Sequence, residues 1–372
     1  IDDWDAATTL PKELRETLKK EFPLTQTRLA DVSASADGTK KLLLEFGDGQ
    51  CVETVLIPAA GRFTQCLSSQ AGCAMNCKFC MTGRGGFHGQ LRPGDILNQF
   101  VSIDEPEKLT NAVFMGMGEP LNNYDAVSRA IEVLTADWGF AWSPKRITVS
   151  SIGVLPNLKR YLDEHKTHLA ISLHNPSGEE RLQLMPCEKR WPIKDVTALI
   201  RQYDWSGQRR VSFEYTMFAG WNDTKRHADA LIRLLRGLEC RVNLIRFHKI
   251  PDFPYESSSQ KVMEAFRDRL ASNGITCTIR ASRGEDILAA CGLLELEKLT
   301  KRDEYHAAAL RLIDGLLDHC CDWSADRCGV LTHCTASYHD DGAGRHTNIV
   351  YGDYFLTEAL AKLNGTDPML WI

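Results

Sequence analysis

The chain has 372 residues, of which 43% are hydrophobic and 8% aromatic, an ordinary composition for a globular protein that holds one large domain with additions. Its 49 acidic and 44 basic side chains give a net charge of −5, which excludes the strongly basic body of a generic nucleic-acid binder. Its 13 cysteines are scattered, and we find neither a signal peptide nor an apolar run long enough to span a membrane, which argues against a secreted disulfide framework and against a membrane protein.

The charge is unevenly distributed along the chain. From Thr300 onward there are 11 acidic and 6 basic side chains, so the net charge of −5 lies in this part and residues 1–299 are neutral overall. Contact with RNA would therefore depend on local basic patches such as Lys145-Arg146, Arg209-Arg210, or Arg280 with Arg283. Each patch taken alone is more often a solvated face.

Residues 1–60 are expected to form a small accessory region. Residues 11–22 have the composition of a short charged helix, and Lys40–Phe46 and Cys51–Pro58 indicate two strands that an Asp48-Gly49 turn joins into a hairpin. Because the chain does not begin with Met, we expect this region to lack an amino-terminal piece.

From Gly61 the pattern changes to strands that alternate with helices. The candidate strands are Phe63–Ser68, Asn111–Met115, Arg146–Ser151, Leu169–His174, Arg210–Phe218, Arg241–His248 and Thr276–Ser282. Helical periodicity marks segments between them such as Asp125–Thr135, Ile193–Trp205, Thr224–Arg236 and Ser259–Ser272. Six or seven such units are too few for a closed eight-fold barrel. We therefore predict an α/β fold, a partial (β/α)6 barrel over residues 61–298, with its chemistry at the carboxyl ends of the strands.

Three cysteines spaced as Cys73-Ala-Met-Asn-Cys77-Lys-Phe-Cys80 follow the first of these strands. Thiolates are the ligands of iron–sulfur clusters, and three of them leave one corner of a four-iron, four-sulfur (4Fe-4S) cluster without a protein ligand. An open iron can bind a small molecule and pass it an electron, so the spacing predicts radical chemistry with S-adenosyl-L-methionine (SAM). The alternatives are a zinc site, which lacks a second cysteine pair nearby, and a buried trio of small hydrophobic residues.

A glycine-rich turn, Gly116-Met117-Gly118-Glu119-Pro120, follows the next strand. Glycines allow a ligand to approach the main chain, and the Glu119 carboxylate could take the ammonium group of SAM. Small polar residues that suit contacts with ribose or carboxylate groups stand at the ends of later strands: Ser150, Ser172, His174 and Asn243. Alternatively these residues cap helices or form turns, and the histidine is structural.

Two further cysteines need an explanation. Cys66 lies seven residues before the cluster loop, and Cys291 follows the segment Arg283-Gly-Glu-Asp-Ile-Leu-Ala-Ala. A cysteine between alanines and a glycine is more often a buried small residue than a catalytic one.

Taken together, these motifs resemble those of the RNA adenine-C2 methyltransferases, the RlmN family of radical SAM enzymes. The resemblance covers about residues 5–298 and rests on Arg62–Cys73, the cluster loop, Gly116–Leu121, Ser150–Gly153, Ser172–His174, Asn243–Ile245 and Arg283–Cys291. It implies methylation of an adenosine in large-subunit ribosomal RNA and in tRNA. It also implies an electron donor such as flavodoxin, a monomeric protein, and a reducing cytoplasm that suits an oxygen-sensitive cluster.

The resemblance assigns a role to each motif residue. The cluster would be held by Cys73, Cys77 and Cys80, and SAM would be surrounded by Gly118, Glu119, Ser150, Ser172, Leu173, His174 and Asn243. Cys291 would carry the methyl group as S-methylcysteine, Cys66 would resolve the protein–RNA adduct, and Glu53 would be the proton acceptor. The target base would have to be unstacked, in a loop or in single-stranded RNA.

Residues 299–372 depart from this family, and we expect them to form a short helical tail. His333–Tyr338 and Asn348–Leu360 resemble the carboxyl end of unsaturated glucuronyl hydrolases, which are helical (α/α) barrels. Only about 70 residues match, too few for a barrel, so we expect no hydrolase activity. The helical spacing covers Tyr305–His319 and Tyr351–Leu363, and a zinc site from Cys320, Cys321, Cys328 and Cys334 is the alternative for the stretch between them.

The sequence is also compatible with three other functions. Related C8-methylating enzymes share the cluster and both reactive cysteines. A non-catalytic iron–sulfur module would need the same cluster loop without turnover. A glycosidase would rest on the tail alone.

Overall fold

The computed structural model describes residues 3–21, 27–103, 105–207, 209–250 and 253–283, with the short segments 334–335 and 345–347. The chain divides into two compact units, Ile1–Glu285 and Asp286–Ile372. In the second unit, β13 (Cys334–Thr335) pairs antiparallel with β14 (Arg345–Thr347). The two helices expected in the tail lie outside the described residues, as do three of the four cysteines of the alternative zinc site.

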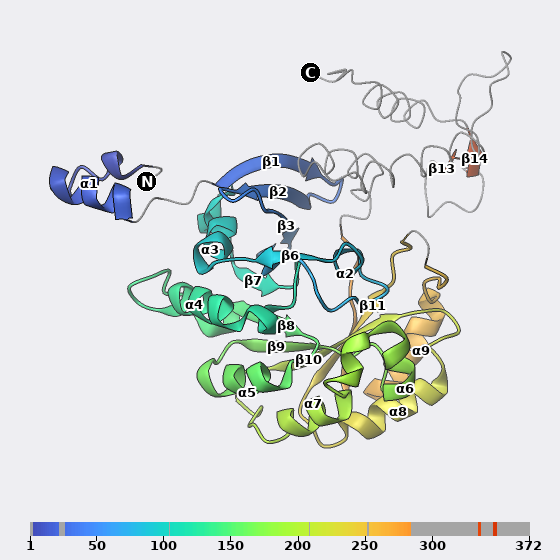
Figure 1. Ribbon diagram of the computed structural model, residues 1–372. Helices are drawn as coiled ribbons and strands as arrows, with labels where there is room; N and C mark the ends of the chain where they lie inside the picture. Colours follow the sequence, from blue (N-terminus) through green and yellow to red (C-terminus); the bar gives the residue numbers. More distant parts are fainter. Residues whose placement is uncertain are drawn as a thin grey trace, which may run out of the picture. The chain divides into compact units, whose positions relative to one another are not determined.

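A ten-stranded sheet runs through the described part of the first unit (Figure 1). Its strands, in spatial order, are β1 (Thr27–Ala34), β2 (Lys40–Phe46), β3 (Cys51–Ala59), β4 (Arg62–Cys66), β7 (Asn111–Phe114), β8 (Ile147–Ser151), β9 (His168–Ser172), β10 (Val211–Met217), β11 (Arg241–Arg246) and β12 (Thr276–Ile279). The strands β1 to β4 are antiparallel neighbours, whereas β4 and β7 to β12 are all parallel. A small separate sheet pairs β5 (Gln70–Gly72) with β6 (Phe87–Gln90).

Helices connect the parallel strands. They are α2 (Met81–Arg84), α3 (Pro93–Val101), α4 (Tyr124–Thr135), α5 (Leu155–Glu164), α6 (Gly178–Leu184), α7 (Ile193–Ile200), α8 (Lys225–Leu235) and α9 (Gln260–Ala271), and α1 (Lys12–Glu21) precedes the sheet. Short 3-10 turns complete the described elements: Trp4–Ala6, Pro106–Lys108, Pro120–Asn123, Pro144–Arg146 and Pro186–Lys189.

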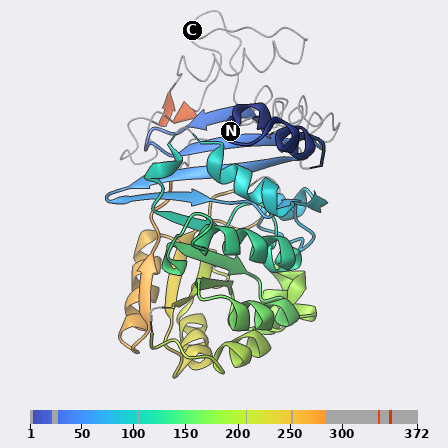
Figure 2. The ribbon, with the colours of Figure 1, turned by 90° about the vertical axis from the view of Figure 1, so that its left-hand side faces the viewer.

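The parallel strands follow one another in sequence order without a reversal. Because each crossover is right-handed, this order places all the helices on one face of the sheet and curls the strands into an open barrel. Figures 1 and 2 show α4, α5, α7, α8 and α9 along the outer side of these strands, and successive helices pack against one another. The six crossovers among the described residues confirm the expected α/β fold, a partial (β/α)6 barrel.

The core lies between the strands and these helices. Alternate strand residues such as Phe114, Val149, Ile171, Phe213 and Leu244 are fully buried on the outer face. Strand side chains alternate between faces, so the polar residues next to them point to the inner face of the barrel. Burying one such side chain contributes about 1.5–3 kcal/mol, so the outer face contributes substantially to the stability of the barrel.

β1 has no counterpart among the strands predicted from the sequence, and some of the predicted strands are longer than the observed ones. The burial of β1 follows no two-residue alternation, and its pairing with β2 is shifted between Leu29 and Asp31, so the usual strand signal is absent. The predicted strand Leu169–His174 ends at Ser172, because His174 adopts a positive φ of 56° and leaves the ladder. The division at residues 298 and 299 stays a prediction.

Candidate active site

The three-cysteine loop lies between β5 and α2, after the first parallel strand. Backbone hydrogen bonds fix its shape: Cys73 N donates to Gly86 O at 2.7 Å, Cys80 N to Cys77 O at 3.0 Å, and Lys78 N to Leu184 O at 2.9 Å. The last of these bonds ties the loop to the end of α6. The thiols of one short loop are therefore held at the carboxyl ends of the strands, as predicted.

The thiols of this loop interact with one another electrostatically. Burial raises the pKa of Cys73 to about 12 and the pKa of Cys77 well above its usual value, and each thiolate would also be repelled by Cys80 and Cys187. Among the described residues, no three His, Cys, Asp or Glu side chains are gathered tightly enough for a single metal ion. A four-iron cluster is wider than one ion, so three soft donors from one loop, two of them buried and Cys80 half-buried, with no fourth protein ligand in the motif, fit such a cluster.

The glycine-rich turn packs against the strand that precedes the cluster loop. A Cβ on Gly116 would lie 2.7 Å from Ser68 Oγ, and Gly118 has a φ of +96° with its Cβ direction blocked by Gln70 at 2.6 Å. Only glycine fits either position without a shift. The turn brings its main chain within hydrogen-bond distance of the end of β4, since Gly116 N donates to Leu67 O at 3.0 Å.

Glu119 ends this turn and is buried. Its carboxylate accepts hydrogen bonds from Leu121 N at 3.0 Å and Ile152 N at 2.9 Å. Burial raises its pKa to about 7, although hydrogen bonds from Ser151, Ile152 and Leu121 act in the opposite direction. A cation placed beside this carboxylate would restore its charge, which is the expected effect of the SAM ammonium group.

A row of polar side chains crosses the inner face of the barrel. Ser172 is in register with Glu214, Glu214 with Asn243, and Asn243 with Thr278. Asn243 Nδ2 donates to Glu214 Oε1 at 2.8 Å, and Thr278 Oγ1 donates to Asn243 Oδ1 at 2.7 Å. Ser150 pairs with Ala170, two residues before Ser172, so it lies on the same face. The structure thus brings three of the expected SAM residues onto one face.

His174 follows this row and is buried. Thr216 N donates to its Nδ1 at 3.0 Å, and burial lowers its pKa to about 3, so the imidazole is neutral at pH 7. Because Nδ1 accepts a hydrogen bond, the proton must be on Nε2. The ring of Phe79, from the cluster loop, meets the His174 ring edge-on at 4.9 Å between centroids.

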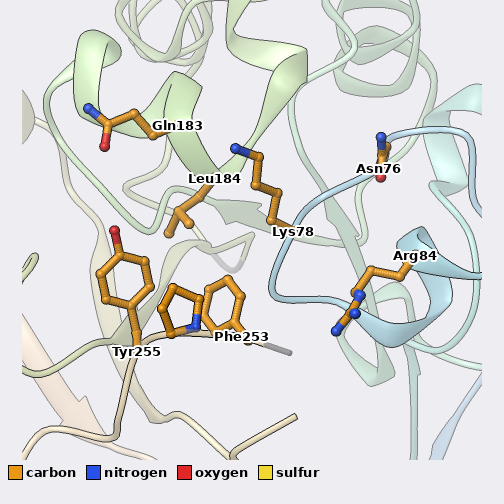
Figure 3. A pocket seen from close by; sticks show the side chains of 8 residues that line it. Asn76, Lys78, Arg84, Gln183, Leu184, Phe253 and Tyr255 are labelled. Carbon is orange, nitrogen blue, oxygen red and sulfur yellow. The ribbon is translucent and has the colours of Figure 1, made fainter. Parts of the chain in front are cut away.

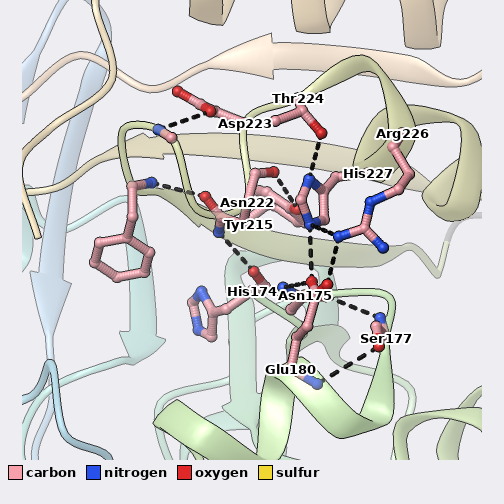
Figure 4. A network of polar contacts seen from close by, with 12 residues as sticks. His174, Asn175, Ser177, Glu180, Tyr215, Asn222, Asp223, Thr224, Arg226 and His227 are labelled. Atoms are coloured by element: carbon pink, nitrogen blue, oxygen red, sulfur yellow. Dashed lines mark hydrogen bonds and ion pairs between the residues drawn. The ribbon is translucent and has the colours of Figure 1, made fainter.

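A polar network holds His174 in place (Figure 4). Asn222 Nδ2 donates to the carbonyls of His174 at 2.8 Å and Thr216 at 2.7 Å. Glu180 joins the start of α6 to α8 by accepting bonds from Arg226 and from His227 at 2.8 Å. Although burial raises the pKa of Glu180, the bonds from Arg226, Asn175 and His227 bring it to about 2.

Cys66 and Glu53 share the face that continues into the barrel. Cys66, the last residue of β4, pairs with Val55 of β3, and Glu53 lies two residues further along the same side of that strand. Burial raises the pKa of Cys66 to about 11, with Arg280 acting in the opposite direction. Glu53 Oε1 lies 3.2 Å from Lys41 Nζ.

Sequence reasoning missed three buried residues of this site. Arg181 donates to Leu173 O and Ser172 O at 2.9 Å each and forms an ion pair with Glu188, so it holds the end of β9. Cys187 lies close enough to Cys73 and Cys77 to raise their pKa values. Glu214 stands at the centre of the polar row. An alternating strand shows a polar inward position such as Glu214, but no local pattern marks the other two.

One arginine of each basic patch proposed from the sequence makes contacts within the fold. Arg146 donates to Thr110 O and lies 3.6 Å over the Trp142 ring. Arg209 donates to Leu162 O and Thr167 O. Arg280 lies 3.6 Å from Glu214 Oε2 and donates to Met115 Sδ at 3.7 Å, across the inner face. Each of these three arginines therefore has a partner within the fold, although the Arg280 side chain is 45% exposed.

Two further expectations concern Cys291 and membrane-spanning segments. Cys291 lies outside the described residues, so its role stays a prediction. Within the described part of the chain, no helix is both long and apolar enough to cross a membrane.

The partial barrel and its three-cysteine loop define a radical SAM protein. Consistent with this class, residues 67–232 match the radical SAM superfamily. A crystal structure of a radical SAM methyltransferase from Sphaerobacter thermophilus superposes with a TM-score of 0.73 at 41% identity, covering 78% of this chain and 88% of that one.

Two relatives identify the family within the radical SAM class to which the chain belongs. A Porphyromonas gingivalis (strain W83) protein named "Probable dual-specificity RNA methyltransferase RlmN" is 55% identical over 302 residues, 81% of this chain and 88% of that protein. The dual-specificity RNA methyltransferase RlmN of Syntrophus aciditrophicus is 39% identical over 303 residues, 80% of this chain and 87% of that protein. The chain belongs to the RlmN family of radical SAM RNA methyltransferases.

Proposed function

We propose that this chain transfers a methyl group to C2 of an adenosine in RNA, with large-subunit ribosomal RNA and tRNA as substrates and an electron donor such as flavodoxin. The observation that carries the proposal is a convergence at one end of the barrel. The cluster cysteines, Glu119, His174 and Cys66 all lie at the carboxyl ends of parallel strands. These residues belong to motifs far apart in the sequence, and the fold brings them together.

In this proposal the cluster loop binds the iron–sulfur cluster, and the polar residues at the strand ends bind SAM. Cys73, Cys77 and Cys80 would hold a 4Fe-4S cluster, and Glu119 would bind the ammonium group of SAM. The neutral His174 can donate a hydrogen bond from Nε2, while Ser172 and Asn243 offer hydroxyl and amide groups. When bound, the cluster and SAM supply an electrophilic methyl group and, after one-electron cleavage, a carbon-centred radical.

The reactive cysteines act on the methyl group. C2 of adenine lies between two ring nitrogens and is electron-poor, so it suits a nucleophilic carbon radical rather than direct attack on a methyl donor. Cys291 would carry the methyl group as S-methylcysteine, and this carbon would become bonded to C2. The Cys66 thiolate would then attack Cys291 Sγ, so that the disulfide forms as the bond from Sγ to that carbon breaks, and the leaving carbon takes up a proton to become the methyl group of the product. Burial keeps Cys66 as a thiol at neutral pH, so its attack needs a base. Glu53 shares its face and is the proposed proton acceptor.

Nucleoside analysis tests this proposal directly. Anaerobically purified protein with intact iron and acid-labile sulfide is incubated with RNA, SAM and reduced flavodoxin, and the RNA is digested for mass spectrometry. We expect 2-methyladenosine. Exclusive formation of 8-methyladenosine would overturn the C2 assignment, and loaded protein that methylates neither position would indicate an iron–sulfur module without turnover.

A further inference from the structure

A cavity of about 630 Å³ lies beside the cluster loop (Figure 3). Asn76, Lys78 and Arg84 enter it from that loop and from α2, while Gln183 at the end of α6 and Tyr255 after β11 enter it from the other side. These segments follow β4, β9 and β11, so the cavity lies at the carboxyl ends of the strands, where the chemistry is proposed.

The cavity is distinct from the proposed SAM site. None of the residues expected to surround SAM lines it, and neither does Cys66 or Glu53. It shares only the cluster loop, through Asn76 and Lys78, which lie between the cluster cysteines. A group bound there would therefore lie beside the cluster loop.

The chemistry of the lining is that of a nucleotide site. Lys78 and Arg84 are exposed cations, which suit a phosphate, and Asn76 and Gln183 are exposed amides, which can donate to and accept from a base edge. The half-buried Tyr255 offers an aromatic ring, on which a base of any identity can stack.

An aromatic cluster holds this tyrosine in position. Its ring centroid lies 5.3 Å from that of Phe253, 5.5 Å from Trp221 and 5.8 Å from Phe218. Because these aromatic side chains already hold the Tyr255 ring in place, the ring loses little conformational entropy when a base stacks on it.

We propose that this cavity binds one nucleotide of the RNA substrate next to the target adenosine, with its phosphate at Lys78 and Arg84 and its base against Tyr255. This inference rests on the proposed function and extends it. Residues 1–299 have no net charge, so contact with RNA depends on local basic groups, and Lys78 and Arg84 are two such groups beside the cluster loop. A concave site with base-reading amides favours RNA over an acidic electron-donor protein, which would dock across a broader surface.

RNA affinity of the full chain tests the proposal. The probe is a fluorescein-labelled RNA hairpin with adenosine in its loop, measured by anisotropy without SAM at several salt concentrations. For Lys78→Ala we expect weaker binding and a slope of log affinity against log salt that is smaller by about 0.7. For Tyr255→Leu we expect about tenfold weaker binding with the salt slope unchanged, and Tyr255→Phe should bind like the original chain.

A matched control separates this site from general charge. Lys166 is exposed in the loop between α5 and β9, at the opposite end of the barrel, and Lys166→Ala should leave RNA affinity and salt slope unchanged. Unaltered RNA affinity in both Lys78→Ala and Tyr255→Leu would overturn the proposal. The same holds if Lys78→Ala only slows reduction of the cluster by flavodoxin, which would assign the face to the electron donor.

The two proposals fail in different ways. RNA that binds as expected but is never methylated would contradict the proposed function, while the proposal that the cavity binds a nucleotide would still be supported. Normal methylation with unaltered affinity in the cavity variants would contradict only the cavity.

Discussion

On the outer face of the parallel strands, side chains such as Phe213 and Leu244 are fully buried against the helices. On the inner face the same strands carry Ser172, Glu214 and Asn243, joined by hydrogen bonds. The outer residues stabilise the barrel by removing apolar surface from water, whereas the inner residues keep polar groups available to a ligand. Stability and chemistry are thus divided between two sides of the same strands, and substitutions on each side should have separable effects.

The largest expected effect on chemistry comes from Cys66 on the inner face. Cys66→Ala should abolish turnover and accumulate a covalent protein–RNA adduct, because the sulfur that attacks Cys291 is missing. Denaturing gel electrophoresis with labelled RNA detects the adduct. If this variant turns over normally, the assigned role of Cys66 is wrong.

The largest expected effect on stability comes from the outer face. Phe213→Ala should lower the free energy of unfolding by about 3–5 kcal/mol, since it leaves a cavity between β10 and the helices. Ser172 lies on the inner face of the neighbouring strand β9, so Ser172→Ala leaves no such cavity and should change the free energy of unfolding by less than about 1 kcal/mol. Urea unfolding of both variants measures the contrast, and equal losses would remove the proposed division between the faces.

A smaller loss is expected for the turn that carries Glu119. Gly118→Ala combines a positive φ with a Cβ 2.6 Å from the Gln70 side chain, so it should cost about 1–3 kcal/mol and displace the carboxylate. Thermal unfolding and SAM titration check the two parts of this expectation. Gly61→Ala is the control: its φ is also positive, at +67°, but nothing lies within 4 Å of its Cβ direction. SAM binding should therefore be retained in that variant alone.

The smallest effect is a pH dependence of SAM binding. The pKa of Glu119 is raised to about 7 by burial, and only the ionised carboxylate attracts the SAM ammonium group. Affinity should therefore rise with pH through 7 and be about tenfold weaker at pH 6 than at pH 8. Equilibrium dialysis of the loaded protein measures it, with Glu119→Gln as the control that binds weakly and without this dependence. An unchanged slope in that variant would assign the titration to another group.

The sequence itself determined the class of chemistry and the outline of the barrel. The spacing of Cys73, Cys77 and Cys80 is local, and a ligand set within eight residues can be recognised without a fold. Strands in which buried and less buried residues alternate were predicted with bounds within a few residues of the observed ones, and β2 was predicted at its observed bounds, Lys40–Phe46. β1 was missed because its burial shows no alternation.

Only the tertiary structure decided how distant groups share the site. The row through Glu214, the bonds of Arg181 to the end of β9, and the approach of Cys187 to the cluster loop each depend on strand register or loop packing. The same holds for the neutral state of His174, which burial and Thr216 impose, and for the cavity beside Lys78. Local patterns specify which residues are present and on which face they lie, but contacts between residues far apart in the chain arise only when packing fixes their positions in space.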